Sequence, residues 1–168
     1  MAKANLLITF DPTKLESAKT EIAARLADIK EAIKIEKIED GLAEVTVKDA
    51  KKTVSQLKKM AIKDKNKFAS TFNWIPVDVW ATAKIADMQK NVKEIQKGIA
   101  EKDKWKMEIG RHKTDLHERD LIMKLTEVID KPNVDLAKPD KILRVEIVKD
   151  KCALSLLKPD EILSVAKL

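Results

Sequence analysis

The first 74 residues repeat their hydrophobic positions in a way that predicts a sheet covered by helices. A period of two predicts a strand, whereas apolar residues three and four apart predict the buried face of a helix. In chain order we expect a strand at residues 5–10, a helix at residues 15–29, a strand at residues 33–39, a strand through Ala43, Val45 and Val47, a helix at residues 49–62 and a strand at residues 68–74. This order, β-α-β-β-α-β, is that of a ferredoxin-like domain.

Local signals fix two boundaries in this half. Asp40-Gly41 lies between two alternating segments, and this pair suits a tight hairpin turn because both residues tolerate a positive φ. Asp49 precedes the second helix, where its carboxylate can accept a hydrogen bond from a free N–H group of the first turn.

A domain boundary is expected after residue 75. Pro76 has no N–H to donate to a central strand, so the segment around it belongs at the edge of a sheet or in a linker. We therefore expect a ferredoxin-like domain at residues 1–75 and a second domain at residues 76–168.

The second half begins with apolar residues at helical spacing from Ile85 onward, which predicts a long helix of about 20 residues, or roughly 30 Å. Trp105, Met107 and Ile109 then alternate toward a core, with Lys106 pointing away. The alternation predicts a strand that ends where Gly110 breaks the pattern.

A further helix and two strands should complete this domain. Asp115 followed by Glu118 resembles a capping box, which predicts a helix at residues 116–130 that Pro132 ends. Pro139-Asp140 then leads into two strands. The second domain is thus predicted to have the order α-β-α-β-β, and the fold class of the chain is α+β.

Composition narrows the class of protein. The chain has 168 residues, of which 44% are hydrophobic and 37% are charged, as in a soluble globular protein. The net charge is +6; residues 1–80 carry 15 basic and 12 acidic side chains and residues 81–168 carry 19 and 16, so the excess is equal in both halves. This balance fits a nucleic acid or another anionic partner, but charge-rich surfaces also occur in proteins from hot environments.

Several classes are excluded or disfavoured. No apolar run is long enough to span a membrane, and the start of the chain lacks the pattern of a secretory signal, so we expect a cytoplasmic protein. Cys152 is the only cysteine, which rules out an intrachain disulfide and a multi-cysteine zinc site; we expect it to be a small core residue. The three glycines are too scattered for a nucleotide-binding loop, and no cofactor is expected.

A basic corner is the strongest candidate for function. Arg111, His112 and Lys113 are expected between a strand and the N-terminus of a helix, where free N–H groups and the helix dipole favour phosphate. The alternative is a solvated loop in which Arg111 pairs with a local carboxylate. The spacing alone does not separate these two interpretations.

The second half resembles the THUMP domain of tRNA thiouridine synthetases, methyltransferases, pseudouridine synthases and acetylation adaptors. The matching features, in chain order, are the strand Trp105-Lys106-Met107 that ends at Arg111, the Val134-Asp135-Leu136 and Pro139-Asp140 segments, and Val145-Glu146-Ile147. In that family a ferredoxin-like domain precedes the THUMP domain, as the first half does here. The family usually has paired arginines where this chain has Arg111-His112.

The resemblance implies binding of tRNA, chiefly at its acceptor end, and delivery to a catalytic domain. We expect direct RNA contacts from Lys106, Arg111, His112 and Lys113, with electrostatic help from Lys104, Lys138 and Lys141. Lys106 points away from the core and should be free to reach a ligand. The first half lacks the aromatic residues with which an RNA-recognition motif stacks bases, so we expect it to be a packing and positioning domain.

Too little chain follows the predicted strands for a catalytic domain, so we expect a non-catalytic adaptor. The resemblance favours an adaptor that presents tRNA to a separate enzyme, most nearly a tRNA cytidine acetyltransferase. Two alternatives stay open. One is a structural subunit that binds another protein without contacting RNA, and the other is a metal-dependent RNA-processing enzyme that uses His117 and Glu118.

Overall fold

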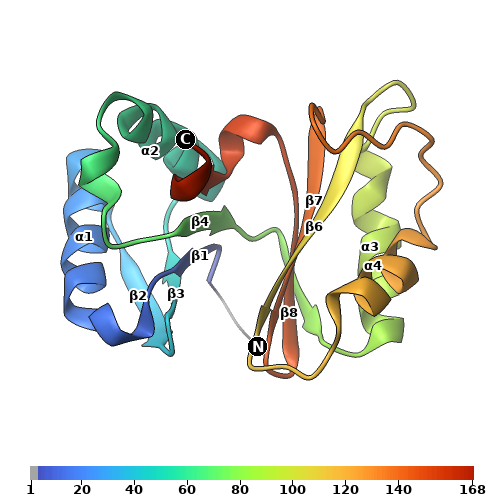
Figure 1. Ribbon diagram of the computed structural model, residues 1–168, viewed down its shortest axis with the longest axis horizontal. Coiled ribbons are helices and arrows are strands. Elements are labelled where there is room, and N and C mark those ends of the chain that lie inside the picture. The colour runs from blue at the N-terminus through green and yellow to red at the C-terminus, as the bar shows by residue number, and fades with distance from the viewer. Residues whose placement is uncertain (1–3) are drawn as a thin grey trace. The chain divides into compact units, whose positions relative to one another are not determined.

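The computed structural model describes residues 4–168, which form two compact units (Figure 1). The first unit comprises Met1–Val77 together with Asp160–Leu168, and the second comprises Asp78–Pro159. The sequence placed the boundary after residue 75. The last nine residues, however, return to the first unit, whereas the sequence placed them in the second.

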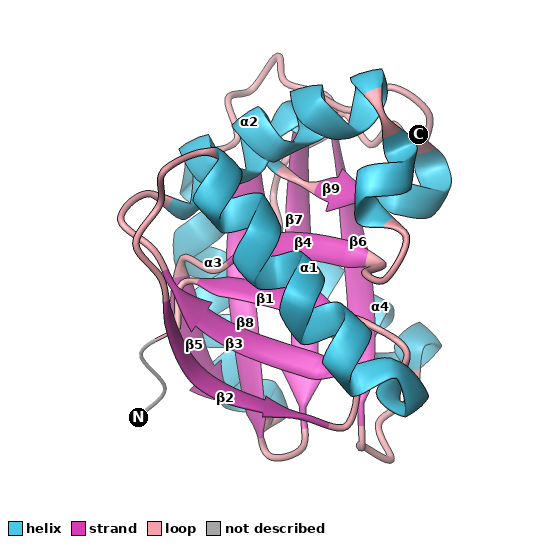
Figure 2. Ribbon diagram, turned by 90° about the vertical axis from the view of Figure 1, so that its left-hand side faces the viewer, coloured by secondary structure: helices cyan, strands magenta, loops and turns pink. Residues whose placement is uncertain are grey.

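The first unit has the predicted ferredoxin-like order. Its elements are β1 (Leu6–Thr9), α1 (Leu15–Asp28), β2 (Lys34–Glu39), β3 (Leu42–Thr46), α2 (Ala50–Lys63), β4 (Asn73–Pro76) and, from the end of the chain, β9 (Leu163–Ser164). In the described part of the chain these strands form one sheet in the order β2-β3-β1-β4-β9, with antiparallel neighbours (Figure 2). Helices α1 and α2 pack on the same core as this sheet.

Both local signals in this half are confirmed. Asp40 and Gly41 have φ values of 52° and 82°, as a tight hairpin between β2 and β3 requires. The Asp49 side chain accepts a hydrogen bond from the N–H of Lys52 and caps α2.

The predicted strand at residues 68–74 is wrong in its first part. Residues Lys65–Phe68 form a 3-10 turn, and the strand β4 begins only at Asn73. Phe68 is buried through this turn and Phe72 is 52% exposed, so the aromatic spacing that suggested alternation arises from two different local structures.

The second unit has a four-stranded sheet with helices on one face. Its elements are β5 (Val79–Thr82), α3 (Ile85–Ile95), β6 (Trp105–His112), α4 (Glu118–Thr126), β7 (Lys141–Val148) and β8 (Lys151–Leu157). The strand order is β5-β8-β7-β6; β6 and β7 are parallel and the other neighbours are antiparallel. The α-β-α-β-β order predicted for this half is present, preceded by the edge strand β5, which the sequence placed at an edge or in a linker.

Both helices of this unit are shorter than predicted. α3 has 11 residues and gives way to a 3-10 turn at Gln96–Gly98, so the apolar repeat continues past the end of the α-helix. α4 begins at Glu118, and its N-cap residue is His117, whose side chain makes no capping hydrogen bond, so the expected capping box of Asp115 and Glu118 is not formed. No helix among residues 4–168 has the length and apolar character needed to cross a bilayer.

Candidate nucleic-acid interface

The two faces of strand β6 have different chemistry. Trp105, Met107 and Ile109 lie on the face that packs against α3 and α4, as the alternation predicted. The intervening side chains lie on the opposite face, beside those of β7 that stand opposite them in the parallel register: Glu108 opposite Arg144, and Gly110 opposite Glu146.

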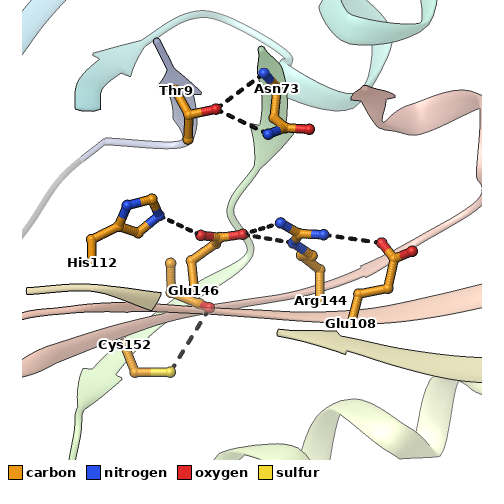
Figure 3. Close-up of polar contacts among 8 residues, drawn as sticks. Thr9, Asn73, Glu108, His112, Arg144, Glu146 and Cys152 are labelled. Carbon is orange, nitrogen blue, oxygen red and sulfur yellow. Dashed lines mark hydrogen bonds and ion pairs between the residues drawn. The ribbon is translucent and has the colours of Figure 1, made fainter. Parts of the chain in front are cut away.

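A row of charged side chains crosses this second face. Glu108 accepts a hydrogen bond from Arg144, with Nη1 and Oε1 3.1 Å apart, and Arg144 Nε donates to Glu146 Oε1 at 2.6 Å (Figure 3). The other oxygen of Glu146 lies 2.8 Å from Nε2 of His112 (Figure 3). Lys106 adds an ion pair with Glu108 at 2.8 Å, so basic and acidic side chains alternate from Lys106 through Glu108 and Arg144 to Glu146.

The central pair of this row is largely buried. The Glu146 side chain is 1% exposed and that of Arg144 is 14% exposed. Burial alone would raise the pKa of Glu146, but the hydrogen bond from His112 and the charge of Arg144 outweigh it and hold this pKa below its usual value. Burial likewise opposes the charge of Arg144, yet Glu146 and Glu108 raise its pKa above the usual value. Glu146 and Arg144 therefore stay ionised, and their contacts with His112 and Glu108 tie β6 to β7.

The predicted basic corner does not converge on one point. Strand β6 continues through Arg111 to His112, so these neighbours point to opposite faces of the sheet. Arg111 is exposed and its Nη1 donates to the carbonyl of Leu116 at 3.0 Å, while His112 binds the buried Glu146. The chain turns only at Lys113, which has a φ of 53°.

A different basic group forms at this end of the sheet. The N–H of Lys149, in the turn between β7 and β8, donates to the carbonyl of His112 at 2.9 Å. This bond brings Lys149 beside Lys113, and both residues are exposed and have a left-handed backbone. We call Arg111, Lys113 and Lys149 the strand-end cations. Lys149 gives no signal of this role in the sequence, because its proximity to Lys113 depends on the pairing of β6 with β7.

The other predicted RNA contacts lie at the far end of β6. Lys104 and Lys138 are exposed; Lys104 lies 3.8 Å from Asp135, and the backbone N–H of Lys138 donates to the same carboxylate. Lys141 is only 23% exposed and binds Asp103 at 3.0 Å. A strand of this length spans roughly 23 Å at the usual rise, so this group and the strand-end cations are separate sites.

Lys106 is not free in the way the sequence suggested. It faces away from the helices as predicted, but its side chain is 19% exposed and its ammonium group binds Glu108. Lys106 and Lys141 are therefore both engaged in ion pairs, Lys106 with Glu108 of the same strand and Lys141 with Asp103 just before β6.

The residues proposed for alternative chemistry are not assembled into a site. Cys152 is fully buried in the core, as predicted, and burial raises the pKa of its thiol to about 12. His117 and Glu118 are exposed at the start of α4, and residues 4–168 hold no group of three or more histidine, cysteine, aspartate or glutamate side chains placed to bind a metal ion.

Comparison with protein families identifies the second unit. Residues 83–157 match the model of the THUMP domain, so this segment, from the end of β5 to the end of β8, is a THUMP domain. This confirms the resemblance seen in the sequence. No curated protein matches the chain.

Solved structures share the fold of both units. The chain is similar to PH1313 from Pyrococcus horikoshii (TM-score 0.61, 14% identity, 93% of this chain and 55% of that one). It is also similar to TrmN from Thermus thermophilus (TM-score 0.58, 12% identity, 92% of this chain and 45% of that one). A possible methylase from Clostridium difficile has a TM-score of 0.58 and 16% identity over 92% of this chain and 41% of that one. The chain thus spans about half the length of these proteins.

Proposed function

We propose that this chain, through the THUMP domain at residues 83–157, binds tRNA at its acceptor end and presents it to a separate tRNA-modifying enzyme. The match to the THUMP domain carries this proposal, because the family resemblance implies tRNA binding. The partner that we propose is a cytidine acetyltransferase, which the strand Trp105-Lys106-Met107 favours by its resemblance to the acetylation adaptors.

The strand-end cations are the proposed centre of the RNA surface. Arg111 comes from the end of β6, Lys113 and Lys149 come from the two loops at the same end of the sheet, and all three residues are exposed. Cations held at loop ends by a rigid sheet can contact successive phosphates without a large loss of conformational freedom. His112 contributes by holding the end of β6 through Glu146, and we assign it a positioning role rather than direct contact.

We propose that the chain itself does not catalyse the modification. A cysteine nucleophile would need a low pKa, and that of Cys152 is raised to about 12 by burial. His112 is engaged by Glu146, which is 1% exposed. We assign the chemistry to the separate tRNA-modifying enzyme proposed above.

Filter binding tests the RNA proposal. The ligands are a whole tRNA, the same tRNA without its single-stranded 3′ end, and an unstructured RNA of equal length, each measured at several salt concentrations. We expect the whole tRNA to bind most tightly, with an affinity that falls steeply as salt rises. Equal affinity for all three RNAs contradicts acceptor-end recognition, and no binding at low salt supports a structural subunit instead.

The partner enzyme is tested separately. The tagged protein is captured from the native cells with and without ribonuclease, and the modified nucleosides of the retained tRNA are identified by mass spectrometry. An acetyltransferase that co-purifies, together with acetylcytidine in the tRNA, supports the adaptor proposal. Recovery of a methyltransferase or thiouridine synthetase in its place contradicts the choice of partner while leaving tRNA binding intact.

A further inference from the structure

Strand β2 (Lys34–Glu39) is an exposed edge of the sheet in the first unit. In the described part of the chain it pairs with β3 alone, whereas at the other end of the sheet β4 is covered by β9 (Figure 2). Five of its six residues are exposed, and Ile35 is 38% exposed. An edge of this kind offers N–H and C=O groups to another strand.

The sequence of this strand is complementary to itself when reversed. Residues 34–39 read K-I-E-K-I-E. In an antiparallel pair of two copies centred between Glu36 and Lys37, every lysine stands opposite a glutamate and every isoleucine opposite an isoleucine. We propose that β2 is a homodimer interface, at which the strand pairs antiparallel with the same strand of a second copy of this chain.

The irregularity in β2 fits this symmetry. Ile35 stands opposite Val45 and Lys37 opposite Glu44, so a bulge lies between them and Glu36 is the extra residue. The bulge keeps Ile35 and Ile38 on the face of the core and turns the charged side chains to the other face. Because the bulge lies at the proposed two-fold axis, residues that stand opposite each other in the two copies have their side chains on the same face of the joined sheet.

Charge complementarity distinguishes a second copy from other occupants. Within one copy the four charges already form neighbouring pairs, Lys37 with Glu39 at 2.9 Å and Lys34 with Glu36 at 3.8 Å. Charged residues usually protect an edge strand from association, because like charges meet when two edges approach. Here opposite charges meet in the antiparallel orientation, whereas a parallel pair would align lysine with lysine and glutamate with glutamate.

The interface consists of one short strand pair, so the dimer should be weak. Complexes with small buried areas bind weakly, and we expect association at roughly 10 μM to 1 mM protein. The two-fold arrangement closes on itself, since each copy has used its β2 edge once the dimer forms. A dimer rather than a fibre is therefore expected.

A charge-exchange experiment tests the dimer by sedimentation velocity. Wild type should shift from monomer to dimer as its concentration rises over that range. K34E/K37E leaves four glutamates in the strand and E36K/E39K leaves four lysines, so each variant alone should stay monomeric at every concentration. A mixture of the two in equal amounts should form a heterodimer at least as well as wild type.

The control variant K90E/K93E makes the same charge change as K34E/K37E, but at two exposed lysines of α3 in the other unit. It should dimerise as wild type does. Circular dichroism establishes that each variant is folded before it is used. The proposal is overturned if wild type stays monomeric over the whole concentration range. It is also overturned if both strand variants still dimerise alone, or if their mixture stays monomeric.

Discussion

Gly110 stands directly opposite Glu146 in the parallel pairing of β6 and β7, and the missing side chain of the glycine makes room for the carboxylate. A Cβ atom added at Gly110 would overlap both carboxylate oxygens and the carboxyl carbon of Glu146. The buried carboxylate can therefore reach both Arg144 and His112 only beside a residue without a side chain. The glycine is required here for space, since its backbone is that of an ordinary strand residue.

Replacing Gly110 with alanine should destabilise the protein by about 2–4 kcal/mol, because the methyl group displaces a buried charge from its partners. Urea unfolding measures the change. Gly98→Ala is the matched control: its added Cβ would lie 2.7 Å from Leu156 Cδ2, the end of a flexible side chain that can move, so its cost should be smaller.

The steric origin of this effect has its own test. In the background of Glu146→Ala the carboxylate is absent, and alanine at position 110 should then cost less than it does in wild type. An equal cost in both backgrounds would mean that the glycine is needed for a reason other than the space taken by Glu146.

The Glu146 carboxylate should make stability depend on pH in the acid range. Its pKa is held below the ordinary value of 4.5 in the folded protein, so the unfolded chain takes up this proton first as the pH falls. The stabilisation is complete above the ordinary value and is lost as the pH falls through the folded value. Glu146→Gln should therefore be less stable than wild type by about 2 kcal/mol at pH 7, with the difference shrinking toward acid.

Unfolding free energies of both proteins between pH 7 and the acid range give this difference directly. The other carboxyl groups titrate in both proteins, so their contributions to the unfolding free energy cancel in the difference. A difference that stays constant with pH would show that glutamine disturbs the packing rather than the charge of the row.

The parts of the fold that follow from local sequence are the parts that could be predicted. Asp40-Gly41 and Asp49 act through their own backbone and their nearest neighbours, and both have the expected conformation. The return of β9 beside β4 gives no such signal, because its two residues have no period of their own and owe their strand conformation to pairing with Asn73 and Trp74.

The sequence pointed to Arg111, His112 and Lys113 as candidates, but it gave neither their geometry nor the proximity of Lys149. Alternation along β6 is enough to place Arg111 and His112 on opposite faces, yet the glycine before them suggested that the strand had ended. The partners of the charged residues come from β7, more than thirty positions later, so the register of a parallel pair decides them. For the same reason Lys149 joins the strand-end cations.

Cys152 should be inert to alkylation in the folded protein. It is fully buried, and its pKa of about 12 leaves only a small fraction of thiolate near neutral pH. Labelling with iodoacetamide at pH 8, followed by mass spectrometry, should be at least a hundredfold slower than labelling of a free thiol and should accelerate only where urea unfolds the chain. Rapid labelling without urea would mean that β8 opens locally.

Removing two of the strand-end cations should weaken RNA binding in a manner that depends on salt. Each phosphate contact contributes about 0.9 to the slope of log Kd against log salt, so Arg111→Ala with Lys113→Ala should lower that slope by about 2. The loss of affinity should be similar for all RNA sequences, because phosphate contacts carry no base information.

The decisive comparison is with Lys106→Ala and Lys141→Ala, which remove the same number of positive charges from the same domain. Their side chains are 19% and 23% exposed and bind Glu108 and Asp103, so this variant should lose stability and keep the salt slope of wild type. Filter binding over a range of salt and urea unfolding of both variants separate the two effects. If the slope falls equally in both variants, the RNA surface extends along the whole of β6 and is not confined to its end.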